Sequence, residues 1–202
     1  MKKFVLVSII ISLIGVSTKA QVLSTGIKAG GDLAYMITDY DVLESSPISG
    51  FHGGVFFRLR SRGLVGLKTE VLYATRGSNF DIANSPANDK IEVRLSYIDL
   101  PLFLTFKANE TVSFELGPQV SILVDGETKF ITPNGEVITE YNPENDPEIG
   151  LAGSIDLDLP GQLGIYARAN FGLSNTATIL TSTSLNNVWL QIGLKYRIFE
   201  AM

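Results

Sequence analysis

Cysteine is absent from the 202-residue sequence, and histidine occurs once, at His52. The first absence excludes disulfides and thiolate metal sites, and a single histidine is a thin ligand set for any other metal. Beyond the N-terminal segment the sequence has no run of about 18 apolar residues, whereas a spanning helix needs about 20. We therefore predict no metal site and no cofactor, and we expect any membrane association to use β-structure or a surface contact.

A net positive charge is also absent, since the formal charge is −5. Proteins that bind nucleic acid carry basic patches that neutralise phosphates, so nucleic acid is not an expected partner. The length is compatible with one domain.

The first 20 residues, MKKFVLVSIIISLIGVSTKA, are typical of a secretory signal peptide. Lys2 and Lys3 precede a short apolar run, and the small residues before Gln21 suit cleavage. An uncleaved anchor is the alternative, but the run is short for a membrane span. We predict a signal peptide over residues 1–20 and a single domain over 21–202; losing three lysines takes the formal charge from −5 to −8.

The rest of the chain repeats one unit, in which apolar and polar residues alternate and turn residues follow. This period of two predicts β-strands, and no helical period separates them. Eight segments fit the pattern, at residues 25–36, 49–60, 64–76, 93–106, 111–124, 148–159, 163–171 and 189–199. We expect a bulge before Tyr97, and a bulge or local loss of pairing at Pro118.

The connections alternate in length, which predicts an antiparallel up-and-down meander. Residues 61–63, 107–110 and 160–162 form tight turns, whereas 37–48, 77–92, 125–147 and 172–186 form long loops. Short turns at one end and long loops at the other match an outer-membrane barrel, with its turns in the periplasm and its loops outside the cell. The predicted fold is therefore all-β, an eight-stranded transmembrane β-barrel in the bacterial outer membrane.

The apolar faces of the eight segments carry no charged residue, while the opposite faces carry charges of both signs. A soluble, lipocalin-like ligand-binding barrel would turn its apolar face inward and remains an alternative. Strand lengths of at least 9–11 residues and the near balance of the charges favour the inverted arrangement, with charges inside. We expect the inward charges to pair as two clusters: Arg58, Lys68, Glu70, Asp99 and Glu115 in one, and Asp156, Arg168 and Lys195 in the other.

Several stretches, in order, resemble the PorT-like "porin family" outer-membrane β-barrel domain of Bacteroidetes, among them GIKAGGDLAYM, GFHGGVFFRLR, YIDLPLFLTFK and VWLQIGLKYRIF. The resemblance implies an eight-stranded outer-membrane barrel and brings no catalytic motif. The last strand also resembles the signal that outer-membrane proteins present to their assembly machinery, with Gln191, Gly193, Tyr196 and Ile198 and the aromatic Phe199.

His52 faces inward in this scheme, and some eight-stranded barrels are lipid-modifying enzymes. Such an enzyme needs a nucleophile within hydrogen-bond reach of its base, and Ser121 and Ser154 are inward hydroxyls at unknown distance. We predict no enzymatic activity and no catalytic residue, and we keep a lipid-modifying barrel enzyme as the alternative.

The long loops are acidic, and few basic residues accompany their carboxylates. The simplest interpretation of these carboxylates is a solvated rim. The functional alternatives are cation bridging to lipopolysaccharide and docking of a basic protein. Asn134-Gly135 predicts a hairpin over residues 129–139 that extends the wall above the membrane. The expected role is structural or interactive, with outer-membrane lipids, lipopolysaccharide, the assembly machinery and a protein at the loops as partners.

Overall fold

The computed structural model describes residues 22–38, 43–60, 63–82, 90–132, 135–141, 147–173 and 185–201. Every regular element among them is a strand, and none of these residues forms a helix able to cross a membrane. The predicted signal peptide lies outside the described residues. The strands are β1 (Val22–Thr38), β2 (Leu43–Ser46), β3 (Ile48–Arg60), β4 (Val65–Ile82), β5 (Lys90–Lys107), β6 (Val112–Thr132), β7 (Gly135–Tyr141), β8 (Glu148–Asp158), β9 (Leu163–Gly172) and β10 (Leu185–Ala201).

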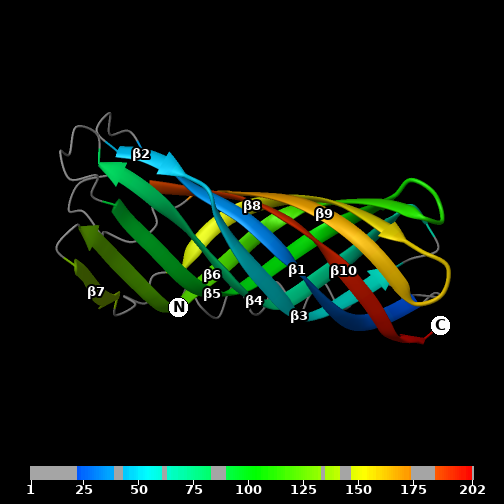
Figure 1. The fold of residues 1–202 in the computed structure, drawn as a ribbon. Helices are drawn as coiled ribbons and strands as arrows, with labels where there is room; N and C mark the ends of the chain where they lie inside the picture. The colour runs from blue at the N-terminus through cyan, green and yellow to red at the C-terminus, as the bar shows by residue number, and fades with distance from the viewer. Residues whose placement is uncertain are drawn as a thin grey trace, which may run out of the picture.

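Eight of these strands close into an antiparallel barrel, which confirms the predicted fold. The order around the wall is β4-β3-β1-β10-β9-β8-β6-β5, and β5 pairs again with β4. The first and last long strands, β1 and β10, pair from Leu23↔Ala201 to Thr38↔Leu185. Figure 1 shows the strands crossing the barrel at a tilt, as closure of a sheet requires.

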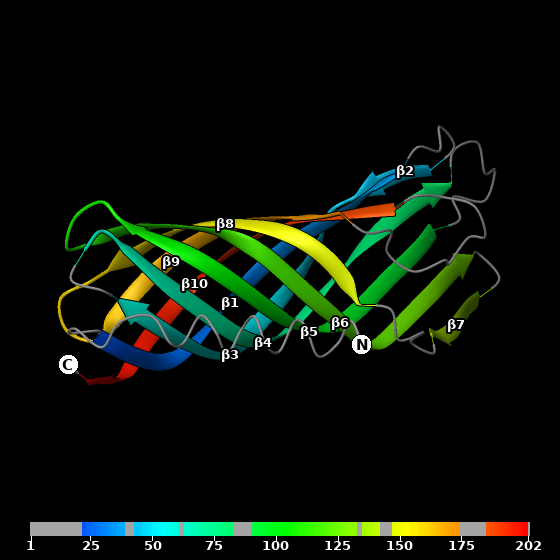
Figure 2. The same ribbon diagram turned by 180° about the vertical axis from the view of Figure 1, so that it is seen from behind.

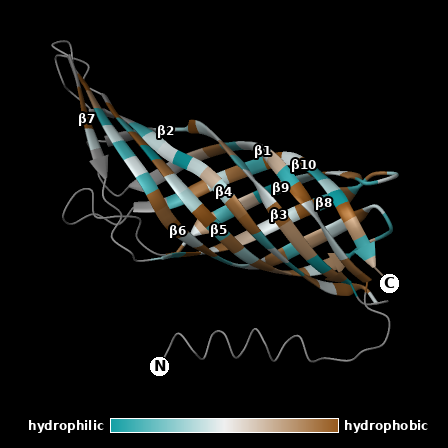
Figure 3. Cartoon of the chain, turned by 90° about the horizontal axis from the view of Figure 1, so that it is seen from below, coloured by the Kyte–Doolittle hydropathy of each residue, from teal (hydrophilic) through white to brown (hydrophobic). Residues whose placement is uncertain are grey.

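Side chains alternate between the two sides of the wall, except where a bulge shifts the alternation by one residue. In β9, Ile165 and Phe171 are exposed, whereas Tyr166, Arg168 and Asn170 are buried. Figure 3 shows the same alternation of hydrophobic and hydrophilic residues along the strands. The exposed side is the aliphatic one, so the protein is inverted relative to a soluble barrel and the lipocalin-like alternative is wrong.

Exposed aromatic side chains gather toward both ends of the apolar wall. Near the short turns they are Phe57, Phe106, Phe114, Tyr196 and Phe199; toward the long connections they are Phe51, Tyr73 and Phe171. Two such girdles flank the apolar band of a transmembrane barrel. The wall therefore presents a membrane-spanning surface.

The sequence pattern underestimated the strands on one side of the barrel. Residues 77–92 were expected to form a loop, yet β4 continues to Ile82 and β5 begins at Lys90, paired as far as Asp81↔Lys90. The strands β2, β4, β5, β6 and β7 thereby form an open sheet that projects beyond the ends of β8 and β9 (Figures 1 and 2). Val93, Leu95 and Tyr97 form a buried apolar cluster in this projecting sheet.

The hairpin predicted over 129–139 is present as β6 and β7, with Lys129↔Ile138 and Thr132↔Gly135 in register. Gly135 lies in the strand, so the connection is residues 133–134, outside the described part. The bulge expected before Tyr97 is confirmed by a register shift between Ser96 and Tyr97. Opposite Pro118 the β5–β6 ladder is interrupted between Pro101↔Gln119 and Leu104↔Leu116, as expected for a residue that lacks the N–H donor.

Candidate functional site: the charged lumen

The lumen holds equal numbers of buried cations and anions. Six basic and six acidic side chains are buried among the described residues: Lys28, Arg58, Lys68, Arg76, Arg168 and Lys195, with Asp32, Glu70, Asp99, Glu115, Glu148 and Asp156. A buried unpaired charge costs roughly several kcal/mol. Because the two signs are equal in number, each buried charge can have a partner inside the wall.

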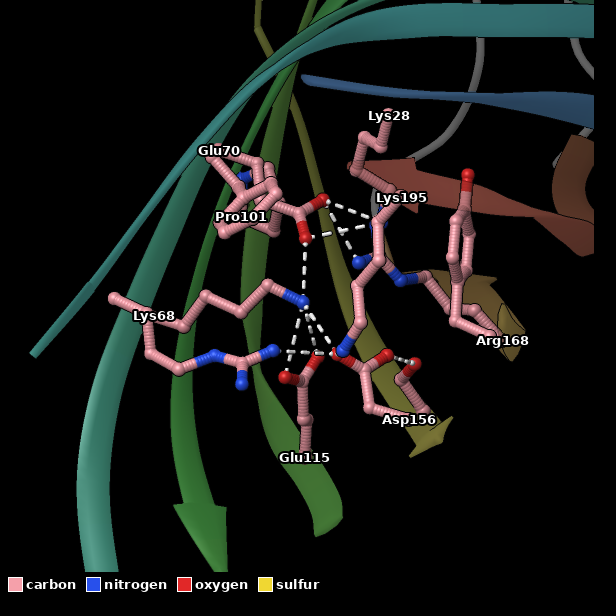
Figure 4. Close-up of polar contacts among 12 residues, drawn as sticks. Lys28, Lys68, Glu70, Pro101, Glu115, Asp156, Arg168 and Lys195 are labelled. Carbon is pink, nitrogen blue, oxygen red and sulfur yellow. Dashed lines mark hydrogen bonds and ion pairs between the residues drawn. The ribbon is translucent and has the colours of Figure 1, made fainter. Parts of the chain in front are cut away.

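Lys68 lies at the centre of the larger group of charges (Figure 4). Its ammonium contacts Glu70 at 3.0 Å, Glu115 at 2.9 Å and Asp156 at 3.0 Å. These carboxylates come from β4, β6 and β8, so one side chain of β4 connects opposite parts of the wall across the lumen.

Two of the three carboxylates around Lys68, Glu70 and Asp156, also meet further cations. Glu70 accepts from Lys28 at 3.0 Å and from Arg168 at 2.8 Å. Asp156 accepts from Lys195 at 2.6 Å.

Arg58 donates to Asp156 at 2.9 Å and to Asp158 at 3.1 Å, near the periplasmic end. Apart from Asp99, the two predicted clusters therefore form one continuous network, because Asp156 contacts both Lys68 and Arg58 of the first and Lys195 of the second. The prediction of two separate clusters is wrong.

Asp99 was placed in the wrong cluster. It accepts two hydrogen bonds from Arg76, at 2.9 and 3.2 Å, nearer the long connections. The Arg76 guanidinium lies 3.8 Å from the centre of the Tyr97 ring and 4.0 Å from that of Trp189, which places it between two aromatic faces. Arg76 was assigned no partner from the sequence, although it continues the inward positions 68, 70, 72 and 74.

Glu148 completes this second group, although its position in the sequence suggested the acidic outer rim. It is buried and accepts from the Tyr97 hydroxyl at 2.5 Å and from the Asn187 amide at 3.2 Å. Arg76, stacked between Tyr97 and Trp189, thus fills the lumen above the main network.

His52 lies between the two groups and contacts neither predicted serine. Its Nδ1 is hydrogen-bonded to the Asp32 carboxylate and its Nε2 to the Tyr166 hydroxyl. Ser121 accepts a hydrogen bond from Gln119 at 3.1 Å, and Ser154 donates to the Ala167 carbonyl at 3.2 Å. The histidine therefore connects two buried side chains, with no serine among its hydrogen-bond partners in the described structure.

Little free volume accompanies the side chains at the periplasmic end, where a cavity of about 10 Å³ lies beside Ser24, Phe56, Arg58 and Lys195. Two larger cavities, of about 370 and 860 Å³, are lined in part by Arg76 and by Arg168 respectively. Within the described residues no three histidine, aspartate or glutamate side chains are grouped as a metal site would require. The arrangement can hold the wall strands together across the lumen, and it leaves little space for a ligand beside Arg58 and Lys195.

Residues 19–178 match the model of the outer membrane protein beta-barrel domain family. The chain belongs to this family. Its members are barrels of the bacterial outer membrane, which is where the exposed apolar wall locates this protein. No curated protein sequence matches the chain.

Two solved barrels illustrate the likeness of fold. Ail, the attachment invasion locus protein of Yersinia pestis, solved with the heparin analogue sucrose octasulfate, has a TM-score of 0.52 at 15% identity, over 87% of this chain and 99% of Ail. Neisserial surface protein A has a TM-score of 0.52 at 11% identity, over 88% of this chain and 99% of that protein. At such identities the likeness concerns the fold alone.

Proposed function

We propose that this protein is a closed, non-transporting barrel of the outer membrane that presents its projecting sheet to a protein outside the cell. The charged lumen supports the first half of the proposal, because its side chains hold the wall from inside and occupy the path that a solute would take. The inverted hydrophobicity of the wall supports its residence among lipids and lipopolysaccharide.

The projecting sheet supports the second half of the proposal, which is the contact with a protein outside the cell. Its β6–β7 hairpin exposes aliphatic and aromatic side chains above the barrel: Phe130, Ile131, Val137 and Ile138. Exposed apolar patches beyond the lipid band are typical of protein contact sites, and the outer strand of a sheet can pair with a strand of a partner. In the described structure β7 pairs with β6 alone.

The proposal also includes two points that come from the sequence. One is membership of the narrower PorT-like family, and the other is recognition of the last strand by the assembly machinery. We propose no enzymatic role, since His52 and its partners Asp32 and Tyr166 are buried and no serine is among the hydrogen-bond partners of His52 in the described structure.

The test is photo-crosslinking in intact cells. A photoreactive amino acid at Val137 should give an adduct with another protein, whereas the same amino acid at the lipid-facing Leu104 should react with lipid alone. If position 137 gives no protein adduct while the barrel is correctly assembled, the interaction role is wrong.

A further inference from the structure

The strand β7 forms one outer edge of the projecting sheet (Figure 2). β8 pairs with β6 only as far as Ser121↔Glu148, and from Gly126 to Thr132 the neighbour of β6 on that side is β7. On the far side of β7 the described residues contain no further strand that continues the sheet. One row of backbone N–H and C=O groups of β7 therefore points away from β6.

The strand register determines which backbone groups of β7 point outward. Thr132 and Gly135 enclose a connection of two residues, so they form a hydrogen-bonded pair, as the ends of a β-turn do. Opposite residues of an antiparallel ladder alternate between hydrogen-bonded and non-hydrogen-bonded pairs. Val137 and Thr139 therefore exchange backbone hydrogen bonds with β6, whereas the N–H and C=O groups of residues 136, 138 and 140 point outward.

The two outer edges of the projecting sheet differ in their protection against pairing. Natural proteins blunt exposed edges with short strands, proline or lysine. The opposite edge, β2, has four residues, Leu43–Ser46, and Pro47 follows it. β7 has seven residues, GEVITEY, without proline or lysine, and its central residues Val137, Ile138 and Thr139 are all β-branched. Of these two edges, β7 is the one suited to accept another strand.

A second copy of the chain is a poor partner for this edge. Two β7 strands that pair antiparallel through all three outward positions would place residue 138 opposite itself and Glu136 opposite Glu140. Like charges directly opposite each other destabilise a sheet, whereas opposite charges stabilise it. A strand with lysine or arginine at both of these positions therefore fits the edge better than β7 itself does.

We infer that β7 binds a β-strand of another protein by edge pairing, and that this strand carries two basic residues at the spacing of Glu136 and Glu140, with an apolar residue between them. The inference rests on the proposed function and specifies how the partner is bound. Backbone hydrogen bonds supply affinity in this mode of recognition, and side chains supply specificity. Val137 and Ile138, which are 61% and 56% exposed, would then lie beside the partner's side chains on the two faces of the extended sheet.

Two substitutions at residue 138 test the pairing in intact cells, with the photoreactive amino acid kept at position 137. Ile138→Pro removes the outward N–H and no hydrogen bond to β6, and an edge strand tolerates proline at such a position. It should lower the yield of the protein adduct by about tenfold or more, because a backbone hydrogen bond to the partner is lost. Ile138→Thr keeps the N–H and the β-branched shape, and it should retain most of the adduct.

The outcomes separate the edge pairing from the proposed function. An unchanged yield from Ile138→Pro, or an equal loss from Ile138→Thr, would overturn the edge pairing and leave the contact with a protein standing. A missing adduct in the wild-type chain would overturn the proposed function and the edge pairing together. An adduct made of two copies of this chain would assign the edge to self-association and overturn the inference.

A designed peptide tests the preference for basic residues. The probe is a capped peptide of alternating valine and threonine with two lysines at the spacing of Glu136 and Glu140, and the control peptide has two glutamates instead. When the lysine peptide is added to the purified full-length barrel in detergent, it should slow the hydrogen exchange of amides 136, 138 and 140, while amides 137 and 139 are already protected by β6. Equal protection by both peptides would overturn the charge preference, and protection by neither would overturn the edge pairing.

Discussion

Lys68 is the residue on which the pairing of the lumen depends most visibly. Its ammonium is shared by Glu70, Glu115 and Asp156, all within 3.0 Å, and all four side chains are almost fully buried. Replacement by methionine keeps the length of the side chain and removes its charge. The three carboxylates would then share a reduced set of cations.

Lys68→Met should therefore lower the free energy of unfolding by about 3–5 kcal/mol, the usual effect of removing one partner of a buried ion pair. Denaturant unfolding of the barrel in lipid vesicles measures it. Lys107→Met, at a half-buried position beside a periplasmic turn, is the control and should change the value by less than about 1 kcal/mol. A Lys68→Met barrel as stable as wild type would show that the network contributes nothing to stability.

The glycines give a second prediction at this scale. Gly153→Ala has room for its Cβ and should raise the free energy of unfolding of the barrel by about 0.5–1 kcal/mol. Gly54→Ala should instead block folding or strongly destabilise it, because its Cβ would lie 2.0 Å from the Val71 carbonyl oxygen. The same unfolding assay compares the two variants. Equal changes in the free energy of unfolding from Gly153→Ala and Gly54→Ala would contradict the interatomic distances around these two glycines.

At the scale of the strand, alternation decides which side chains meet lipid. Ile155 of β8 projects outward between the two girdles, whereas its neighbours Ser154 and Asp156 are buried. Ile155→Arg or, on β5, Leu102→Arg should destabilise the barrel by about 2–4 kcal/mol near the midplane or prevent its assembly. Ile155→Met should change stability by less than about 1.5 kcal/mol. Folded fraction in vesicles is the readout, and unimpaired assembly of both arginine variants would contradict the topology.

The β6–β7 hairpin is an element that the barrel should not need. Shortening residues 129–139 to a tight turn should leave assembly and heat modifiability unchanged, because these residues lie above the lipid. In intact cells, protease should cleave the wild-type chain in the long connections. Cleavage from outside at the short turns 61–63 or 160–162 would mean that the orientation is inverted.

The strands and their faces could be predicted because a period of two is a local property of the sequence. The pairing inside the lumen could not, since it depends on which strands stand opposite each other after closure. Lys68 reaches Asp156 across the lumen, and His52 meets Tyr166, which is 114 residues away in sequence. Asp99 was assigned to the wrong cluster because its partner, Arg76, stands at the end of the predicted strand 64–76 and was given no place in the lumen.

The projecting sheet was missed for a similar reason. Gly77, Ser78 and Asn79 have the composition of a loop, yet they lie within β4 and pair with β5. A Cβ on Gly77 would lie 1.8 Å from the Val93 carbonyl oxygen, so the glycine permits a close approach of two strands. From the sequence alone, a glycine that allows strand packing cannot be distinguished from one that makes a turn.

For the whole molecule, closure of the wall and filling of the lumen act together. A closed barrel leaves no strand edge in the hydrocarbon, and eight strands enclose a space that side chains can fill. Here charged and aromatic side chains occupy that space in two groups, around Lys68 and around Arg76. The central claim is therefore that the barrel is a plugged scaffold and not a channel.

Planar-bilayer recording of the purified full-length barrel tests this claim most directly. We predict no stable, large conductance over the range of voltages that porins withstand, because ion-paired side chains block the lumen at both levels. A reproducible open channel of porin-like conductance would contradict the account and assign the protein to transport.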